Sequence, residues 1–252
     1  MKKLLISAFI AILFVSCGNS SSSYKYEETP IDKIVKKVSS LPNYTIILSD
    51  MDYQESPEKF KHKYKIVFPP ANNPDTLLVE ESEWYDVSPI YFKKHENDLG
   101  MTLVTCKNFA ASKKVSPAGY SNYVGNEKYG KWESNNSGGS FWSFYGKYAF
   151  MSSMFRMMSP VPRSYYNDYR RYDRRGATYY GSAGNGRTRY GTNSNGNNSS
   201  SNWARKPTSF KQKVRSKVTA SAARAKKSRI SSTSSTRRGS SSRRSYGGGF
   251  GK

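Results

Sequence analysis

The sequence predicts an α+β fold: one small domain with an N-terminal helix and an antiparallel sheet of about four strands, followed by a largely disordered basic C-terminal half. Three observations support this prediction. A helical apolar pattern begins near residue 30, strand-like segments follow it, and the charge then changes sign. Residues 24–100 contain 10 Lys or Arg and 14 Asp or Glu. Residues 101–252 contain 29 Lys or Arg and only 4 Asp or Glu. We therefore expect the domain to span residues 24–115.

The helix is expected to begin at Thr29. Thr29 is a good capping residue, Pro30 suits the first helical position, and Asp32 favours the positive end of a helix. Apolar residues then recur at the spacing of one helical face, at Ile31, Ile34, Val35 and Val38. Leu41-Pro42-Asn43 ends the helix.

The strands are predicted from alternation and from β-branched or aromatic composition. In the clearest of them, residues 60–68, aromatic and apolar residues alternate with lysines. The expected strands are 44–48, 60–68, 76–87 with a break near Ser82, and 99–107, and the segment 89–93 is a weaker candidate. Short gaps between them favour an antiparallel meander with the helix on one face.

The domain offers no arrangement of residues that selects a catalytic or metal site. His62 falls on the apolar side of its strand, so we expect a core histidine. No His or Cys spacing is typical of a zinc site. Asp50 and Asp52 are either a weak cation site or a solvated strand end, and we favour the solvated strand end. Cys106 is expected to be a buried thiol rather than a reactive one.

The N-terminus has the order of a secretory signal: Lys2 and Lys3, then an apolar run over 4–15, then Cys17. The run is shorter than the roughly 20 residues that a membrane-spanning helix needs. The four residues Phe14-Val15-Ser16-Cys17 resemble the lipobox of bacterial lipoproteins, with Phe14 where that pattern usually has Leu. Simple secretion and a retained signal anchor are the alternatives.

The lipobox resemblance implies a signal peptide over residues 1–16 and lipidation, including palmitate-type acyl chains, at Cys17. Two or more acyl chains anchor a protein stably to a membrane. Residues 17–23 would be a Ser-rich tether. In Bacteroidetes-type lipoproteins, acidic residues just after the cysteine resemble a surface-export signal. Residues 18–26 contain neither Asp nor Glu, so we expect a periplasm-facing protein on the cell membrane or outer membrane.

Residues 116–140 are interpreted as a Gly/Asn/Ser-rich linker, and residues 141–160 as an amphipathic aromatic and methionine segment. Such a segment suits a helix in a membrane interface. Packing on the domain and docking on a partner protein are the alternatives. The membrane-interface candidates are Phe141, Trp142, Tyr145, Tyr148, Met154 and Phe155.

Residues 161–252 are predicted to be a basic, low-complexity, disordered tail, because aliphatic residues are too few to offset the ordering entropy. A helix over about 208–228 fits the spacing of Phe210, Val214 and Val218, but its surroundings are too polar to stabilise it alone. Arginines neutralise phosphates and tyrosines stack on bases. The candidate polyanion-binding residues are Tyr165, Arg170, Arg171, Arg174, Arg175, Arg237, Arg238, Arg243 and Arg244. A solvated spacer is the alternative.

Several blocks of the C-terminal half resemble a group of uncharacterised bacterial lipoproteins. They are residues 125–130 (GNEKYG), 140–142 (SFW), 144–148 (FYGKY), 164–169 (SYYNDY) and the terminal 248–252 (GGFGK). The resemblance implies an envelope location and no known activity.

The sequence thus predicts a non-enzymatic, membrane-anchored envelope lipoprotein without a cofactor. Its expected partners are the membrane, through the N-terminal lipid, and anionic lipid headgroups, lipopolysaccharide or extracellular DNA. The alternative is an exported or surface nucleic-acid-binding protein that uses the basic tail. An enzyme of unknown type is the remote alternative.

Overall fold

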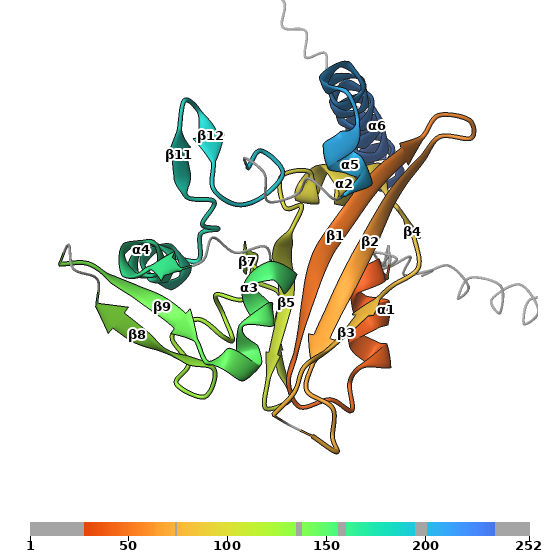
Figure 1. Cartoon of the computed structure of the whole chain (residues 1–252). Coiled ribbons are helices and arrows are strands. Elements are labelled where there is room, and N and C mark those ends of the chain that lie inside the picture. The colour runs from red at the N-terminus through yellow and green to blue at the C-terminus, as the bar shows by residue number, and fades with distance from the viewer. Residues whose placement is uncertain (1–27, 74, 135–137, 156–159, 195–200, 235–252) are drawn as a thin grey trace, which may run out of the picture. The chain divides into compact units, whose positions relative to one another are not determined.

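The computed structural model describes residues 28–73, 75–134, 138–155, 160–194 and 201–234, with side chains through Lys227. Residues Glu28–Arg229 form one compact unit (Figure 1). The predicted signal peptide, Cys17 and the tether lie outside the described residues, as do Arg237, Arg238, Arg243 and Arg244.

The described residues contain the following elements. The helices are α1 (Pro30–Lys37), α2 (Pro89–His95), η1 (Gly146–Tyr148), α3 (Phe150–Met154), α4 (Arg163–Arg174), α5 (Asn202–Arg205) and α6 (Thr208–Ser234). The strands are β1 (Tyr44–Gln54), β2 (Lys59–Phe68), β3 (Leu78–Glu81), β4 (Tyr85–Val87), β5 (Met101–Lys107), β6 (Ala110–Ser112), β7 (Ser116–Pro117), β8 (Gly130–Ser134), β9 (Ser140–Phe144), β10 (Val161–Pro162), β11 (Ser182–Gly184) and β12 (Arg187–Thr188).

The main sheet has seven antiparallel strands. Its principal order is β3-β2-β1-β5-β6, with β4 also paired to β2 and β7 to β5. The long β1–β2 hairpin forms its centre, where Ile46 lies opposite Ile66 and Tyr53 opposite Phe60. The break predicted near Ser82 separates β3 from β4, and both pair with β2.

The start of α1 is confirmed as the sequence predicts. Thr29 Oγ1 accepts a hydrogen bond from the Asp32 backbone N–H at 3.3 Å, and Asp32 Oδ2 accepts one from the Thr29 N–H at 2.9 Å. This reciprocal pair is a capping box, which satisfies two backbone donors at the helix end. Ile31 and Ile34 are buried against the sheet.

Residues Pro89–Lys93, the weaker strand candidate, are helical instead, as the start of α2. Ser88 caps this helix by accepting a hydrogen bond from the Tyr91 N–H at 3.3 Å, and Pro89 occupies its first position. These are the signals that identified α1, at Thr29 and Pro30. The strand interpretation was wrong because it weighted Tyr91 and Phe92 by composition and did not weigh the cap.

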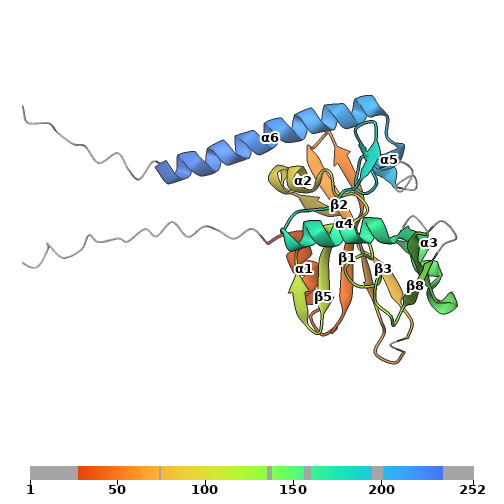
Figure 2. The ribbon, with the colours of Figure 1, turned by 90° about the vertical axis from the view of Figure 1, so that its left-hand side faces the viewer.

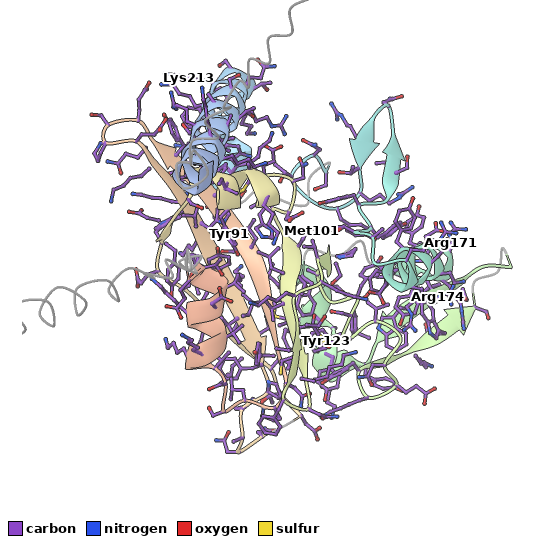
Figure 3. The ribbon with its side chains drawn as sticks, turned by 180° about the vertical axis from the view of Figure 1, so that it is seen from behind. Tyr91, Met101, Tyr123, Arg171, Arg174 and Lys213 are labelled. Carbon is purple, nitrogen blue, oxygen red and sulfur yellow. The ribbon has the colours of Figure 1, made fainter. Side chains whose placement is uncertain are left out.

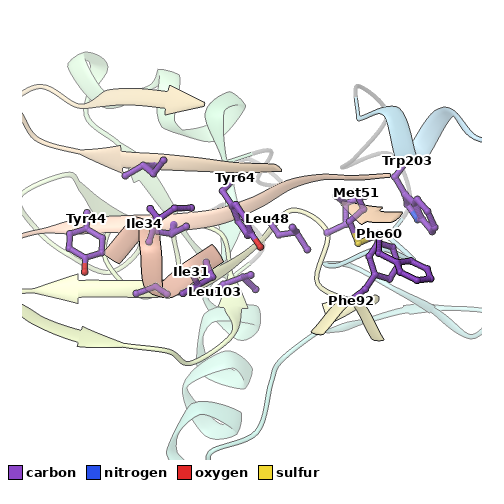
Figure 4. Packing of buried hydrophobic residues seen from close by; sticks show 14 of the residues in the cluster. Ile31, Ile34, Tyr44, Leu48, Met51, Phe60, Tyr64, Phe92, Leu103 and Trp203 are labelled. Carbon is purple, nitrogen blue, oxygen red and sulfur yellow. The ribbon is translucent and has the colours of Figure 1, made fainter. Parts of the chain in front are cut away.

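One face of the main sheet carries the larger core, shown in Figure 4. Helix α1 contributes Ile31 and Ile34, and the sheet contributes residues such as Leu48 and Tyr64. From the C-terminal part, the buried side chains of Trp203, Val214 and Val218 join the same core. Disorder was predicted for this region, with a helix over about 208–228 only compatible with the spacing. The helix exists as α6, because the sheet supplies the apolar surface that its own sequence lacks.

The opposite face of the main sheet is covered by the segment after β7. Ile47 and Val67 of the sheet pack with Tyr123, Tyr148 and Phe155. A further cluster joins this layer to the small β10-β9-β8 sheet and α4, as Figure 1 shows; its buried members are Met101, Tyr120, Val124, Trp142, Val161, Tyr169, Tyr179 and Tyr190.

The prediction of a small four-stranded domain followed by a disordered basic half was therefore wrong. The main sheet has seven strands, and much of the region 116–229 is folded onto it, including residues 116–134 of the supposed linker 116–140. Aliphatic residues are few in this region, but tyrosine and tryptophan rings supply the buried area. A large aromatic side chain buries 150–250 Å², so a count of aliphatic residues underestimated the core.

Candidate polyanion-binding surface

Helix α4 contains four of the sequence-predicted polyanion-binding residues, and a fifth, Arg175, directly follows it. Tyr169 is buried, and the guanidinium groups of Arg170, Arg171, Arg174 and Arg175 are on exposed residues. Figure 3 shows Arg171 and Arg174 on the outer side of this helix. The predicted segment is therefore a helix with an exposed cationic side and not a disordered chain.

Tyrosine packing fixes the orientation of α4. The Tyr169 ring meets the Tyr120 ring edge to face, with 5.4 Å between centroids, and Tyr166 lies 5.5 Å from Trp132. A Cβ on Gly125 would approach the Tyr166 hydroxyl to 2.8 Å, so the turn at this glycine fits closely against α4. Burial raises the pKa of the Tyr169 hydroxyl, which stays neutral in its pocket.

Lysines from β5 and from the segment between β6 and β7 extend the basic side of α4. Burial lowers the pKa of Lys107, and repulsion from the positive charge of Arg170 lowers it further. These two cations are therefore close enough to repel each other. Lys114 forms an ion pair with Asp173 at 3.4 Å, and Lys113 forms one with Asp32 of α1. We define the α4-end surface as Lys107, Lys113, Lys114, Arg170, Arg171, Arg174 and Arg175.

Carboxylates neutralise only part of the α4-end surface. Arg171 pairs with Asp168 at 2.6 Å, within the same helix. Among the described residues, no ion pair involves Arg170, Arg174 or Arg175. The seven cations of this surface thus have three carboxylate partners. These are Asp32 in α1 and Asp168 and Asp173 in α4. Such an excess produces a positive potential that attracts anions.

Tyr165 is the one aromatic among the predicted polyanion-binding residues, and it is partly covered. The guanidinium carbon of Arg189 lies 4.1 Å from the centre of the Tyr165 ring. This cation–π contact occupies a face on which a nucleic-acid base would stack.

The membrane-interface candidates do not form one exposed apolar side. Trp142, Tyr148 and Phe155 are 1%, 1% and 4% exposed, and Tyr145 is 41% exposed. Phe141 and Met154 are half-buried. A strand, a 3₁₀ turn and a short helix divide the segment, so the helical spacing of its aromatics is not maintained. Of the three alternatives, packing on the domain describes its buried side chains.

A second basic surface lies along α6. Its buried residues Val214 and Val218 face the sheet, while Lys213 and Lys217 reach toward Glu55 in the β1–β2 turn, at 2.9 and 3.9 Å. The hydrogen bond from Lys213 lowers the pKa of Glu55. Sequence analysis identified this stretch as basic but did not select it as a site.

A buried polar group beside α2 is a feature that sequence analysis missed. His95 Nδ1 lies 2.7 Å from Asp98 Oδ2, and the Tyr180 hydroxyl donates to Asp98 Oδ1 at 2.5 Å. His62 is fully buried nearby, 5.1 Å from Phe92 between ring centroids, as the expectation of a core histidine requires. No local pattern identifies this group, because Tyr180 joins it from 82 positions away.

The His95–Asp98 pair has the residue types of an acid–base dyad, but both side chains are buried. A small cavity on the other side of the sheet, lined by residues including Ile47, Lys65 and Phe155, has a volume of about 20 Å³. That volume is suited to a single water molecule. Neither place accommodates a substrate in the described conformation.

The preference for a solvated strand end at Asp50 was wrong: this residue, also the weak cation-site candidate, is buried within β1 and has a structural partner. Its carboxylate accepts hydrogen bonds from the backbone N–H groups of Asn202 at 2.7 Å and Trp203 at 3.1 Å. Asp52 instead lies 3.5 Å from Lys206. In the described ranges, no three His, Cys, Asp or Glu side chains gather as metal ligands do. Cys106 is free and buried, as expected.

Comparisons with known proteins give no relative. No family model matches the chain, and neither the curated proteins nor the solved structures include a match. Within the part of the chain that the structure describes, no helix has both the length and the apolarity needed to cross a membrane.

Proposed function

We propose that this chain is a non-enzymatic, periplasm-facing lipoprotein of the bacterial envelope, anchored through Cys17, whose basic surfaces bind anionic envelope components. The observation that carries this proposal is the cation excess of the α4-end surface, where exposed arginines stand on a helix that buried tyrosines fix in place. A fixed array of arginines binds phosphate groups with less entropy loss than a flexible tail.

The expected ligands are phosphate-rich: anionic phospholipid headgroups or lipopolysaccharide. Arginine recognises phosphate through paired hydrogen bonds from its planar guanidinium. Nucleic-acid binding through the same cations is the second candidate. It has less support, because Tyr169 is buried and Arg189 covers Tyr165, so these rings offer little area for base stacking.

Two measurements test the proposal. Mass spectrometry of the mature N-terminus is expected to show Cys17 carrying acyl chains, and an unmodified Met1 start would overturn the anchor. Binding of the full mature chain with Cys17→Ser is then measured on anionic vesicles, neutral vesicles, lipopolysaccharide and duplex DNA over a salt series.

We expect binding to the anionic vesicles and lipopolysaccharide that weakens steeply with salt, and none to neutral vesicles. Binding to DNA alone would favour the second candidate. A chain that binds none of the four at physiological salt would overturn the role assigned to the basic surfaces.

A further inference from the structure

We propose that the α4-end surface is the side of the domain that lies against the membrane, where it binds the phosphates of anionic lipid headgroups. The acyl anchor and the cations would then hold the domain in one orientation. This inference rests on the proposed function, because it requires the lipid on Cys17.

The tether is short. Ten residues lie between Cys17 and Glu28, the first residue of the compact unit, which makes eleven steps from Cα to Cα. Fully extended, this segment spans at most about 40 Å. Glu28 therefore stays within that distance of the lipid anchor, and the surfaces around it are the first to meet the headgroups.

The basic groups of the α4-end surface lie near the start of α1. Figure 2 shows the start of α1 and the C-terminal end of α4 at the left-hand side of the unit. The ion pairs agree with this view. Lys113 pairs with Asp32 in the first turn of α1, and its neighbour Lys114 pairs with Asp173 in the last turn of α4.

One side of the unit thus combines the attachment point of the tether with the cations of the α4-end surface. Helix α6 also runs toward this side, and its sequence there is basic, with Arg224, Lys226 and Lys227. Each Lys or Arg close to an anionic membrane strengthens binding about fivefold, and the effect decays within about 8 Å. Cations on the tethered side come within that distance when this side of the domain rests on the bilayer.

The opposite end of α4 provides a matched comparison. Lys128, Lys131 and Lys147 belong to the region around β8 and η1, which is at the right-hand side of Figure 2. These lysines lie within 4 Å of carboxylates, on Asp75 and Glu133. Removing three positive charges there changes the net charge of the protein as much as removing Arg171, Arg174 and Arg175, but on the side away from the tether.

The first experiment compares these two triple variants in the full mature chain with Cys17→Ser, on vesicles of phosphatidylglycerol and phosphatidylethanolamine. We expect Arg171→Gln, Arg174→Gln and Arg175→Gln together to weaken binding at least tenfold, and Lys128→Gln, Lys131→Gln and Lys147→Gln together to weaken it less than twofold. Circular dichroism checks that both variants fold. Equal weakening by the two triples would overturn the inference while the proposed function stands.

The second experiment measures orientation in the lipidated protein. Lysine acetylation is followed by mass spectrometry after insertion into anionic or neutral vesicles. Lys113 and Lys114 are expected to lose reactivity at least threefold on anionic vesicles, whereas Lys128 and Lys131 keep theirs. Uniform reactivity of the four lysines contradicts the orientation. Loss of DNA binding in the arginine triple, without loss of vesicle binding, would assign the surface to nucleic acid instead.

Discussion

The Trp203 backbone N–H donates a hydrogen bond to Asp50 Oδ1 at 3.1 Å, across 153 positions of sequence. Asp50 Oδ2 accepts a second bond, from the Asn202 N–H at 2.7 Å. Asp50 is buried in β1, and the two donors begin α5. One acidic residue of the central strand therefore caps a short helix from the basic half and attaches that half to the sheet.

Asp50→Asn is expected to destabilise the fold by about 1–3 kcal/mol. The neutral amide oxygen accepts weaker hydrogen bonds than the carboxylate it replaces, and the amide NH₂ can face the backbone N–H groups without bonding to them. Urea unfolding followed by circular dichroism measures the change. Asp52→Asn is the control, because Asp52 is only partly buried and pairs with Lys206 at 3.5 Å. Similar losses in both variants would contradict the capping role of Asp50.

Val218→Asp is expected to detach α6 from the sheet. Val218 is 0% exposed, and an aspartate there would bury a charge without a partner, at a cost above about 3 kcal/mol. Hydrogen exchange should rise over residues 208–227, with the β1–β2 hairpin less affected. The neighbouring change Thr219→Asp is the control, because Thr219 is exposed. Unchanged exchange in the Val218 variant would show that α6 does not depend on this contact.

Gly130→Ala is expected to disrupt the β8–β9 pairing. A Cβ at Gly130 would lie 2.2 Å from the Ser143 carbonyl oxygen and 2.9 Å from the Trp142 ring. Overpacking of this kind costs about 1–3 kcal/mol, which should appear as a lower Tm. At Gly146 no atom lies within 4 Å of such a Cβ, so Gly146→Ala should leave the Tm nearly unchanged. Equal Tm values for the two variants would contradict the close approach at Gly130.

His62 is expected to make the fold less stable in acid. Burial, and secondarily the charge of His95, lowers the pKa of His62 from 6.5 to about 3. Between these values the unfolded chain binds a proton that the folded chain does not. The part of the folding stability that depends on neutral His62 is therefore fully present above pH 6.5 and is lost as the pH falls toward 3. At pH 4 the loss is of the order of 3 kcal/mol.

His62→Phe tests this pH dependence, because a phenyl ring fills a similar volume and does not titrate. Urea unfolding of both proteins between pH 4 and pH 7 should give a steeper decline for the native chain. The lowered pKa values of Glu55 and Glu81 also contribute to acid sensitivity, but equally in both proteins. Parallel curves would show that His62 does not contribute.

The sequence predicted the fold best where the signal was local. The capping residues Thr29 and Asp32 identified α1, and the two-residue period identified β2. The prediction was least accurate after Ser116, where Tyr120, Trp142 and Tyr169 belong to one buried cluster. Aromatic residues suit a membrane interface, a binding tail and a core equally well, and the choice depends on partners far away in sequence.

For the candidate site, the sequence by itself determined the number and sign of the charges, and it singled out Arg170, Arg171, Arg174 and Arg175. Only the tertiary structure decided that these residues belong to a packed helix and its C-cap, and that Lys107, Lys113 and Lys114 join them. The physical reason is that charge and helix caps are local properties of the chain. A surface, by contrast, is created when tyrosine packing and the Asp50–Trp203 contact bring distant segments onto one sheet.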